Sequence, residues 1–146
     1  SSGATATKSG EGYVVRPGSG RTATLTVSGT TADGKSVQLK QMTYKVVSLP
    51  NPQLYWGAEP NGGSISSSRL LQAKFPPEIP LNASYRVLGW TCGAKQGPPK
   101  TGTSGDLSNA NAIINAARSG DQISLIVRVM GPDNIARNVS GVWTKP

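Results

Sequence analysis

The sequence contains no histidine and one cysteine, Cys92. Histidine is the usual general base near neutral pH and a frequent metal ligand, so its absence argues against the commonest catalytic and metal sites. A lone cysteine excludes an intramolecular disulfide and a zinc site built from several cysteines. With no histidine to activate it, Cys92 is expected to be a packed and inert thiol. We therefore expect a protein that is not an enzyme and that uses no metal or cofactor.

Acidic residues are also scarce. The chain has 7 Asp and Glu against 15 Lys and Arg, a net charge of +8. An excess of basic residues is compatible with nucleic-acid binding, but here these residues are scattered along the chain and accompany no nucleic-acid-binding motif. We expect no nucleic-acid partner, and a solvated basic surface suited to acidic protein partners.

Long apolar runs are absent as well. A helix that crosses a membrane needs about 18 or more consecutive apolar residues, and the chain has no such run. We expect a soluble chain or a soluble piece of a larger protein, with no membrane segment of its own. The 18 glycines and 11 prolines indicate many turns and short elements, which favours a mainly β protein.

The first 50 residues predict a small sheet. Residues 1–12 hold no large apolar side chain and predict a frayed start. Ala23, Leu25 and Val27 alternate with threonines, which is typical of a strand with one apolar face, and Asp33-Gly34 favours a hairpin turn. Strands are expected at residues 12–17, 21–29 and 37–49. So few strands cannot close a sandwich, so either a partner supplies edge strands or part of the domain lies outside the chain.

The second half predicts strands around one helix. Residues 84–90 read as a strand in which Tyr85 and Val87 face opposite to Leu88 and Trp90, and residues 91–105 read as a long polar loop. Residues 106–121 predict a helix, capped by Asp106 or Ser108, with an apolar stripe of Ala112, Ile113, Ala116 and Ala117 and a stop at Gly120. Ile123, Leu125, Val127 and Val129 define one face of the next strand, and residues 136–143 form the last strand.

Between the two halves lies "YKVVSLPNPQLYWG", residues 44–57. Pro50 and Pro52 end the preceding strand, because proline has no N–H and restricts the residue before it. Leu54, Tyr55 and Trp56 follow at once. They predict core or interdomain packing, contact with a partner, or an aromatic platform for a sugar or peptide.

Two passages resemble a known family. "RSGDQISLIVRVMGPDNIARNVSGVWTKP" is similar to the C-terminal domain of the GldM/PorM-type proteins, in its order of helix end, apolar strand, Gly-Pro-Asp turn and final strand. "TYKVVSLPNPQLYWG" resembles the strand and Pro-x-Pro junction that precedes that domain. These are envelope proteins of gliding motility and type IX secretion in Bacteroidetes.

The resemblance implies a function in protein transport. Such proteins carry an N-terminal membrane helix and several periplasmic domains, form a dimeric shaft, and build a proton-driven motor complex with an inner-membrane partner. Their C-terminal domain reaches a ring of proteins beneath the outer membrane. This chain would be the distal periplasmic part, a homodimer of two Ig-like, β-sandwich-like domains in tandem. Residues 1–55 would be the C-terminal part of a third periplasmic domain, and residues 56–146 a C-terminal domain with one short α-helix.

In this interpretation the chain acts through contact with the ring proteins, for which the expected residues are Lys74, Lys95, Lys100 and Arg118, with the loop at residues 91–105. The inner-membrane partner would bind parts of the protein that are absent here. The expected interdomain junction consists of Pro50, Pro52, Leu54, Tyr55 and Trp56, a stiff joint between the domains. The alternative is a carbohydrate-binding or adhesion-type β-sandwich of a secreted protein, which would use exposed aromatic side chains.

Overall fold

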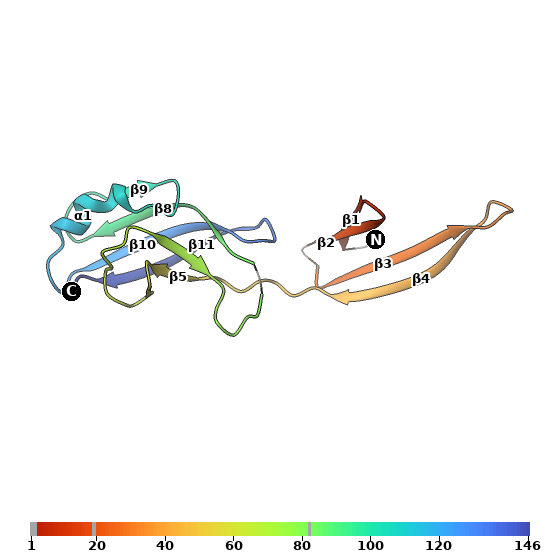
Figure 1. Ribbon diagram of the computed structural model, residues 1–146, viewed down its shortest axis with the longest axis horizontal. Coiled ribbons are helices and arrows are strands. Elements are labelled where there is room, and N and C mark those ends of the chain that lie inside the picture. Colours follow the sequence, from red (N-terminus) through yellow and green to blue (C-terminus); the bar gives the residue numbers. More distant parts are fainter. Residues whose placement is uncertain (1–2, 19, 82) are drawn as a thin grey trace. The chain divides into compact units, whose positions relative to one another are not determined.

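The chain folds into two compact units, Ser1–Ser48 and Leu49–Pro146, called unit 1 and unit 2 below. The computed structural model describes residues 3–18, 20–81 and 83–146 (Figure 1). Both units consist mainly of antiparallel β-strands, which confirms the mainly β prediction. The boundary lies before the predicted one at residues 55 and 56. The reason is that β5 (Gln53–Trp56) pairs along its whole length with β7 (Leu71–Lys74), so its first residues belong to unit 2.

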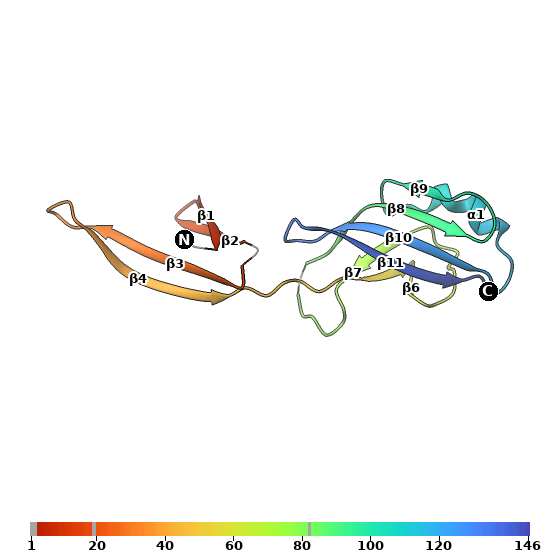
Figure 2. The same cartoon turned by 180° about the vertical axis from the view of Figure 1, so that it is seen from behind.

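Unit 1 consists of two β-hairpins, each a separate two-stranded sheet (Figure 2). The first joins β1 (Ala4–Ser9) to β2 (Gly12–Pro17), and the second joins β3 (Thr22–Thr30) to β4 (Ser36–Lys45). The prediction of a frayed start is therefore wrong for Ala4–Ser9. A strand of small and polar residues carries no apolar signal, and pairing with β2 holds it in place.

The turn of the second hairpin is as predicted. Gly34 has a φ of +80°, a left-handed conformation that glycine adopts without strain, and its N–H donates to the carbonyl of Thr31 at 2.9 Å. The hairpin also contains a β-bulge between Val27 and Ser28, where Leu39 is the extra residue on β4. The predicted apolar face of β3 is only partly covered: Ala23 is buried, Leu25 is half-buried and Val27 is exposed.

Unit 2 contains two sheets that enclose one core. The first has the order β11-β10-β8-β9, and the second has the order β6-β5-β7. The strands are β6 (Glu59–Pro60), β8 (Arg86–Ala94), β9 (Lys100–Gly102), β10 (Gln122–Met130) and β11 (Ala136–Thr144). Side chains of both sheets share a single cluster of buried residues. This arrangement of two facing sheets is what the sandwich-like interpretation requires.

The central strand β10 follows the predicted alternation. Ile123, Leu125, Val127 and Val129 are all 0% exposed, whereas the residues between them point away from the core. The predicted facing of β8 is wrong. Its pairing with β10 skips Leu88, so that Arg128 lies opposite Gly89 and Val129 opposite Val87.

This bulge reverses the parity of β8. As a result Tyr85 and Trp90, which were predicted on opposite faces, are both buried in the same core, and Val87 packs against it.

The region after Trp90 differs most from the prediction. Thr91–Ala94 extend β8, and Lys100–Gly102 form β9, which pairs with β8. The predicted 91–105 loop is therefore a hairpin over part of its length. The helix is also shorter than predicted: a 3₁₀ turn at Ser108–Ala110 leads into α1 (Asn111–Ala116). No helix in the described part of the chain is long and apolar enough to cross a membrane.

The helix buries a stripe other than the expected one. Ile113 and Ala117 are buried as predicted, but Ile114 is buried too, whereas Ala112 and Ala116 are exposed. Asp106 does act near the helix start, where its carboxylate accepts the N–H of Ser108 at 2.9 Å. Gly120 has a φ of +85° but lies beyond the helix, which already ends when Ala117 becomes extended.

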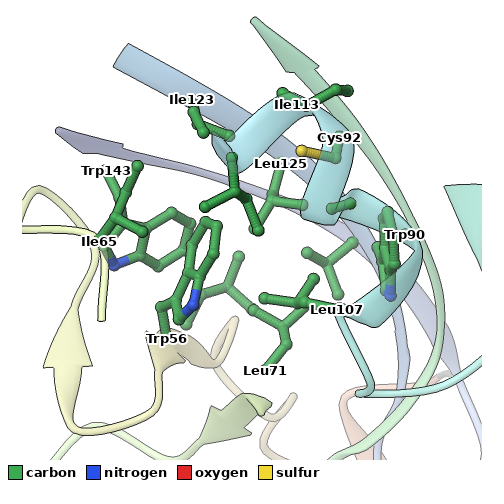
Figure 3. Packing of buried hydrophobic residues seen from close by; sticks show 14 of the residues in the cluster. Trp56, Ile65, Leu71, Trp90, Cys92, Leu107, Ile113, Ile123, Leu125 and Trp143 are labelled. Atoms are coloured by element: carbon green, nitrogen blue, oxygen red, sulfur yellow. The ribbon is translucent and has the colours of Figure 1, made fainter. Parts of the chain in front are cut away.

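Tryptophan side chains dominate the core of unit 2 (Figure 3). Trp56 and Trp143 pack edge to face with ring centroids 5.7 Å apart. Each indole N–H donates to a backbone carbonyl: Trp56 to Ser68 at 2.8 Å, Trp90 to Asp106 at 3.1 Å and Trp143 to Glu59 of β6 at 3.2 Å. The tryptophans therefore connect these three segments of unit 2 to its core.

Glycines make room for two of these rings. A Cβ on Gly102 would lie 2.4 Å from the ring of Trp90, its cross-strand neighbour. A Cβ on Gly141 would lie 2.5 Å from the ring of Trp143, two residues further along β11. Because real Cβ atoms do not approach so closely, the absence of a side chain at these positions is a packing requirement.

Candidate partner-binding surface

The residues of the predicted junction lie in unit 2. Pro52 is buried, and Leu54 and Trp56 are 1% and 0% exposed in the core of that unit. The carbonyl of Pro50 accepts a hydrogen bond from the hydroxyl of Tyr85, which fixes the start of unit 2 to the residue that precedes β8. The apolar run after the prolines is thus explained by core packing. Trp56 presents no surface to a ligand, so the idea of a Trp56 platform for a sugar is wrong.

Tyr55 differs from its neighbours because it is half-exposed. Lys74, one of the expected partner-binding residues, is exposed on β7 and its ammonium group lies 5.0 Å from the centroid of the Tyr55 ring. A cation above an aromatic ring is an attractive pair. Lys74 thus lies on the three-stranded sheet, whereas Lys95, Lys100 and Arg118 lie in or beside the β8–β9 hairpin and the end of α1.

We call Lys95, Lys100 and Arg118 the basic end of unit 2. All three are exposed. Asp121 lies beside two of them: its carboxylate accepts the backbone N–H of Arg118 at 2.7 Å. That hydrogen bond, the side chain of Gln96 and the charges of Arg118 and Lys95 hold the pKa of Asp121 below its ordinary value. Asp121 is therefore ionised at neutral pH, and it offsets only part of the local positive charge.

An open groove runs beside the basic end. It has a volume of about 520 Å³ and is lined by both polar and apolar groups, among them Lys95, Asp121, Ser124 and Val142. A groove whose lining includes charged, polar and apolar groups is suited to a protein segment.

Among the residues that the structure describes, no three His, Cys, Asp or Glu side chains gather as a metal would require. Cys92 is 0% exposed, and burial raises the pKa of its thiol to about 11. The thiol therefore stays protonated and unreactive at neutral pH, which agrees with the expectation of a packed cysteine.

The prediction missed an apolar surface on unit 1. Large apolar side chains lie in solvent on both hairpins and just after β4, including Tyr13 at 70%, Leu39 at 68% and Val47 at 74% exposure. A groove of about 440 Å³ between the hairpins is lined by Lys45 and by seven largely apolar side chains, those of Val15, Pro17, Ala23, Leu25, Tyr44, Val46 and Val47. The alternating pattern predicts that these residues form one face of a strand, but it does not show that no other element of the unit packs on that face.

The structure is thus that of a mainly β chain in two units, with exposed apolar side chains on unit 1 and buried tryptophans in unit 2. In a comparison with family models, residues 1–47 match the family described as the GldM third domain. The match covers nearly all of unit 1 and confirms the resemblance to GldM-type proteins there. A GldM domain indicates a component of gliding motility and type IX secretion. No curated protein matches the chain.

Proposed function

We propose that the chain is the distal periplasmic end of a dimeric motor shaft in the type IX secretion and gliding machinery. Unit 1 joins two copies of the chain, and unit 2 contacts the ring of proteins beneath the outer membrane. The chain acts by mechanical coupling through protein contact and catalyses no reaction. The full protein would be anchored in the inner membrane, where other parts of it meet the motor partner.

The exposed apolar surface of unit 1 carries this proposal, because it belongs to the unit that matches the GldM third domain. Two-stranded hairpins are marginal in water without a further layer to cover them. Exposed apolar side chains on both hairpins therefore favour completion of the unit by another protein surface. A second copy of the chain is the simplest such partner, since homo-oligomers with twofold symmetry are the commonest assemblies.

The first experiment measures the molar mass of the chain in solution. We expect a dimer that dissociates in the double variant Leu39→Asp, Val47→Asp, because both side chains are largely exposed in the single chain and their charges would be buried at the interface. Ile126→Asp is the matched control, since Ile126 is 58% exposed in unit 2 and should leave the dimer intact. A monomeric wild-type chain would contradict the proposal.

The second experiment tests the contact with the ring. The tagged chain is incubated with envelope extract from a type IX-secreting bacterium, and captured proteins are identified by mass spectrometry. We expect enrichment of the ring proteins, reduced by the charge reversals Lys95→Glu and Arg118→Glu at the basic end. Charge reversal of Lys8 and Arg16, exposed on unit 1, is the control. Retention on glycan resin without ring proteins would instead favour the carbohydrate-binding alternative.

A further inference from the structure

The outer edge of β11 has two halves that differ in their partners. Near the end of β11, the backbone groups of Val142 and Thr144 that point away from β10 form hydrogen bonds. The carbonyl of Val142 accepts the N–H of Gly62 at 2.9 Å, and the N–H of Thr144 donates to Gly63 at 3.0 Å. A parallel bridge joins Thr144 to Ser64. This half of the edge thus already binds an extended segment of the same chain.

The other half of that edge is open. Backbone groups alternate in direction along a strand, so Ala136, Asn138 and Ser140 point the same way as Val142. Within the described part of the chain, nothing bonds to these outward N–H and C=O groups. The half-edge has no proline or bulge, two of the features that usually protect an exposed strand from pairing. Its one charged side chain, Arg137, is paired with Asp133.

The other edges of unit 2 are shorter or covered. β6 has only two residues and ends at Pro60. β7 has four residues, and the N–H of Leu71 donates to Gly105 at 2.7 Å. β9 has three residues and lies against the 3₁₀ turn, where the carbonyl of Thr101 accepts the Asn109 side chain at 3.5 Å. The open half of β11 is therefore the longest unprotected edge among the described strands of unit 2.

A groove accompanies this open edge. It has a volume of about 260 Å³ and is lined by Pro52, Gln53, Leu54, Pro60, Asn61, Val139 and Ser140. Val139 is half-buried against the core. Among the other lining residues Pro52, Leu54 and Pro60 are apolar, whereas Gln53 and Asn61 are polar. The groove thus offers an apolar site next to free backbone hydrogen-bonding groups, as in proteins that bind peptides by adding a strand.

The charge of the sheet indicates the kind of peptide. The four strands of this sheet contain no acidic residue, but they contain Arg86, Lys100, Arg128 and Arg137. Arg137 is paired with Asp133, whereas Arg128 lies on the solvent face next to Asn138 on β11. An added strand with acidic side chains on its solvent face would therefore be attracted to the sheet.

We propose that the edge of β11 from Ala136 to Ser140 binds an extended peptide segment of a partner protein. The segment adds a strand beyond β11, places an apolar side chain in the groove beside Leu54 and Val139, and carries acidic side chains on its outer face. This site is separate from the basic end and does not depend on the proposed function.

The test uses a display library of ten-residue peptides and the full chain. We expect enrichment of peptides that alternate apolar and acidic residues. Asn138→Pro should weaken their binding at least tenfold, because it removes an outward N–H that the added strand needs. That N–H pairs with nothing inside the sheet, so the variant should still fold, as a melting curve by circular dichroism will check. Asn138→Ala keeps the N–H and is the matched control, with binding close to that of the wild type.

Three results would overturn the proposal. The first is that the library enriches no peptide. The second is that the enriched peptides bind Asn138→Pro as tightly as the wild type, and the third is that Asn138→Ala loses their binding to the same extent as Asn138→Pro. A further outcome is a self-association of the chain that Asn138→Pro abolishes; the edge would then serve a second copy of the chain and not a foreign peptide. Hydrogen exchange of the Asn138 and Ser140 amides, slowed by bound peptide, reports the backbone pairing directly.

Discussion

At the residue scale, the packing of unit 2 requires glycine at two strand positions, where a larger residue would collide with a tryptophan ring. Gly102 and Gly141 occupy strands, where glycine usually weakens the sheet, yet each lies under a tryptophan ring. The sequence shows glycines and tryptophans in these strands, but it does not show which glycine lies beside which ring. That depends on strand register for Gly102 and on the rotamer of Trp143 for Gly141.

Gly141→Ala is expected to lower the free energy of unfolding by about 1–3 kcal/mol, the usual cost of overpacking a core. The added methyl group would meet the Trp143 ring at 2.5 Å and Asn61 Oδ1 at 3.2 Å. Urea unfolding followed by circular dichroism measures the change. Gly93→Ala in β8 is the control, because its Cβ would meet only Ser124 Oγ at 3.5 Å, an ordinary contact. Equal stability of the two variants would contradict this role for Gly141.

At the element scale, a strand could be predicted where alternation persists and could not where a bulge interrupts it. β10 keeps a strict alternation of buried and exposed positions, and Ile123, Leu125, Val127 and Val129 share one face as predicted. In β8 the bulge at Leu88 changes the parity, so that Trp90 was assigned to the wrong side relative to Tyr85. β9 was missed because its Lys-Thr-Gly sequence has no strand signal of its own.

The candidate site shows the same limit. Lys95 and Lys100 were predicted from their place in the polar 91–105 segment, and Arg118 at the end of the predicted helix. In the structure Lys95 and Arg118 both lie near Asp121, Lys100 begins β9, and Lys74 lies on the other sheet. The open edge of β11 could not be predicted from the sequence. Every residue other than proline carries the same backbone N–H and C=O groups, so the sequence does not show which of them are unpaired until the strand order is known.

The turn between β10 and β11 holds an ion pair, Arg137–Asp133, whose contribution to stability should depend on pH. Arg137 donates to both carboxylate oxygens of Asp133, at 3.0 and 2.5 Å, and this pairing lowers the pKa of Asp133 from its ordinary 3.8. A carboxyl with a lowered pKa stabilises the folded state above its unfolded-state pKa, and this contribution is lost as the pH falls through the folded-state value.

Asp133→Asn should therefore lower the free energy of unfolding by about 1 kcal/mol at pH 7. The difference from the wild type should shrink below a pH of about 4, where the wild-type carboxyl is itself protonated in the unfolded chain. Thermal melting over a pH series measures both effects. Glu78→Gln is the control, since Glu78 is exposed and has no ion pair among the described residues. A pH-independent difference would show that the ion pair is not its source.

At the scale of the whole molecule, the two units differ in how they are stabilised. Unit 2 has a core of its own, with 18 buried residues in one cluster. In unit 1, Ala23 is the only buried apolar residue of the described part. If a second copy of the chain packs on unit 1, the stability of unit 1 depends on protein concentration, whereas the stability of unit 2 does not.

Hydrogen exchange followed by mass spectrometry tests this difference. We expect amides of Ala4–Ser9 and Ser36–Lys45 to exchange faster than those of Gln122–Met130 in dilute solution, and to slow as the chain is concentrated. A tenfold increase in concentration should stabilise unit 1 by up to about 1.4 kcal/mol and leave β10 unchanged. Exchange in unit 1 that does not respond to concentration would exclude association through that unit.

The placement of the tryptophans has a practical consequence for optical spectroscopy. All 3 tryptophans of the chain lie buried in unit 2. The aromatic residues of unit 1 are two exposed tyrosines, Tyr13 and Tyr44. Fluorescence excited selectively in the indole rings therefore reports on unit 2 alone. A tryptophan introduced at Leu39 would give unit 1 an emission signal of its own, so that the unfolding or assembly of each unit could be followed separately in one sample.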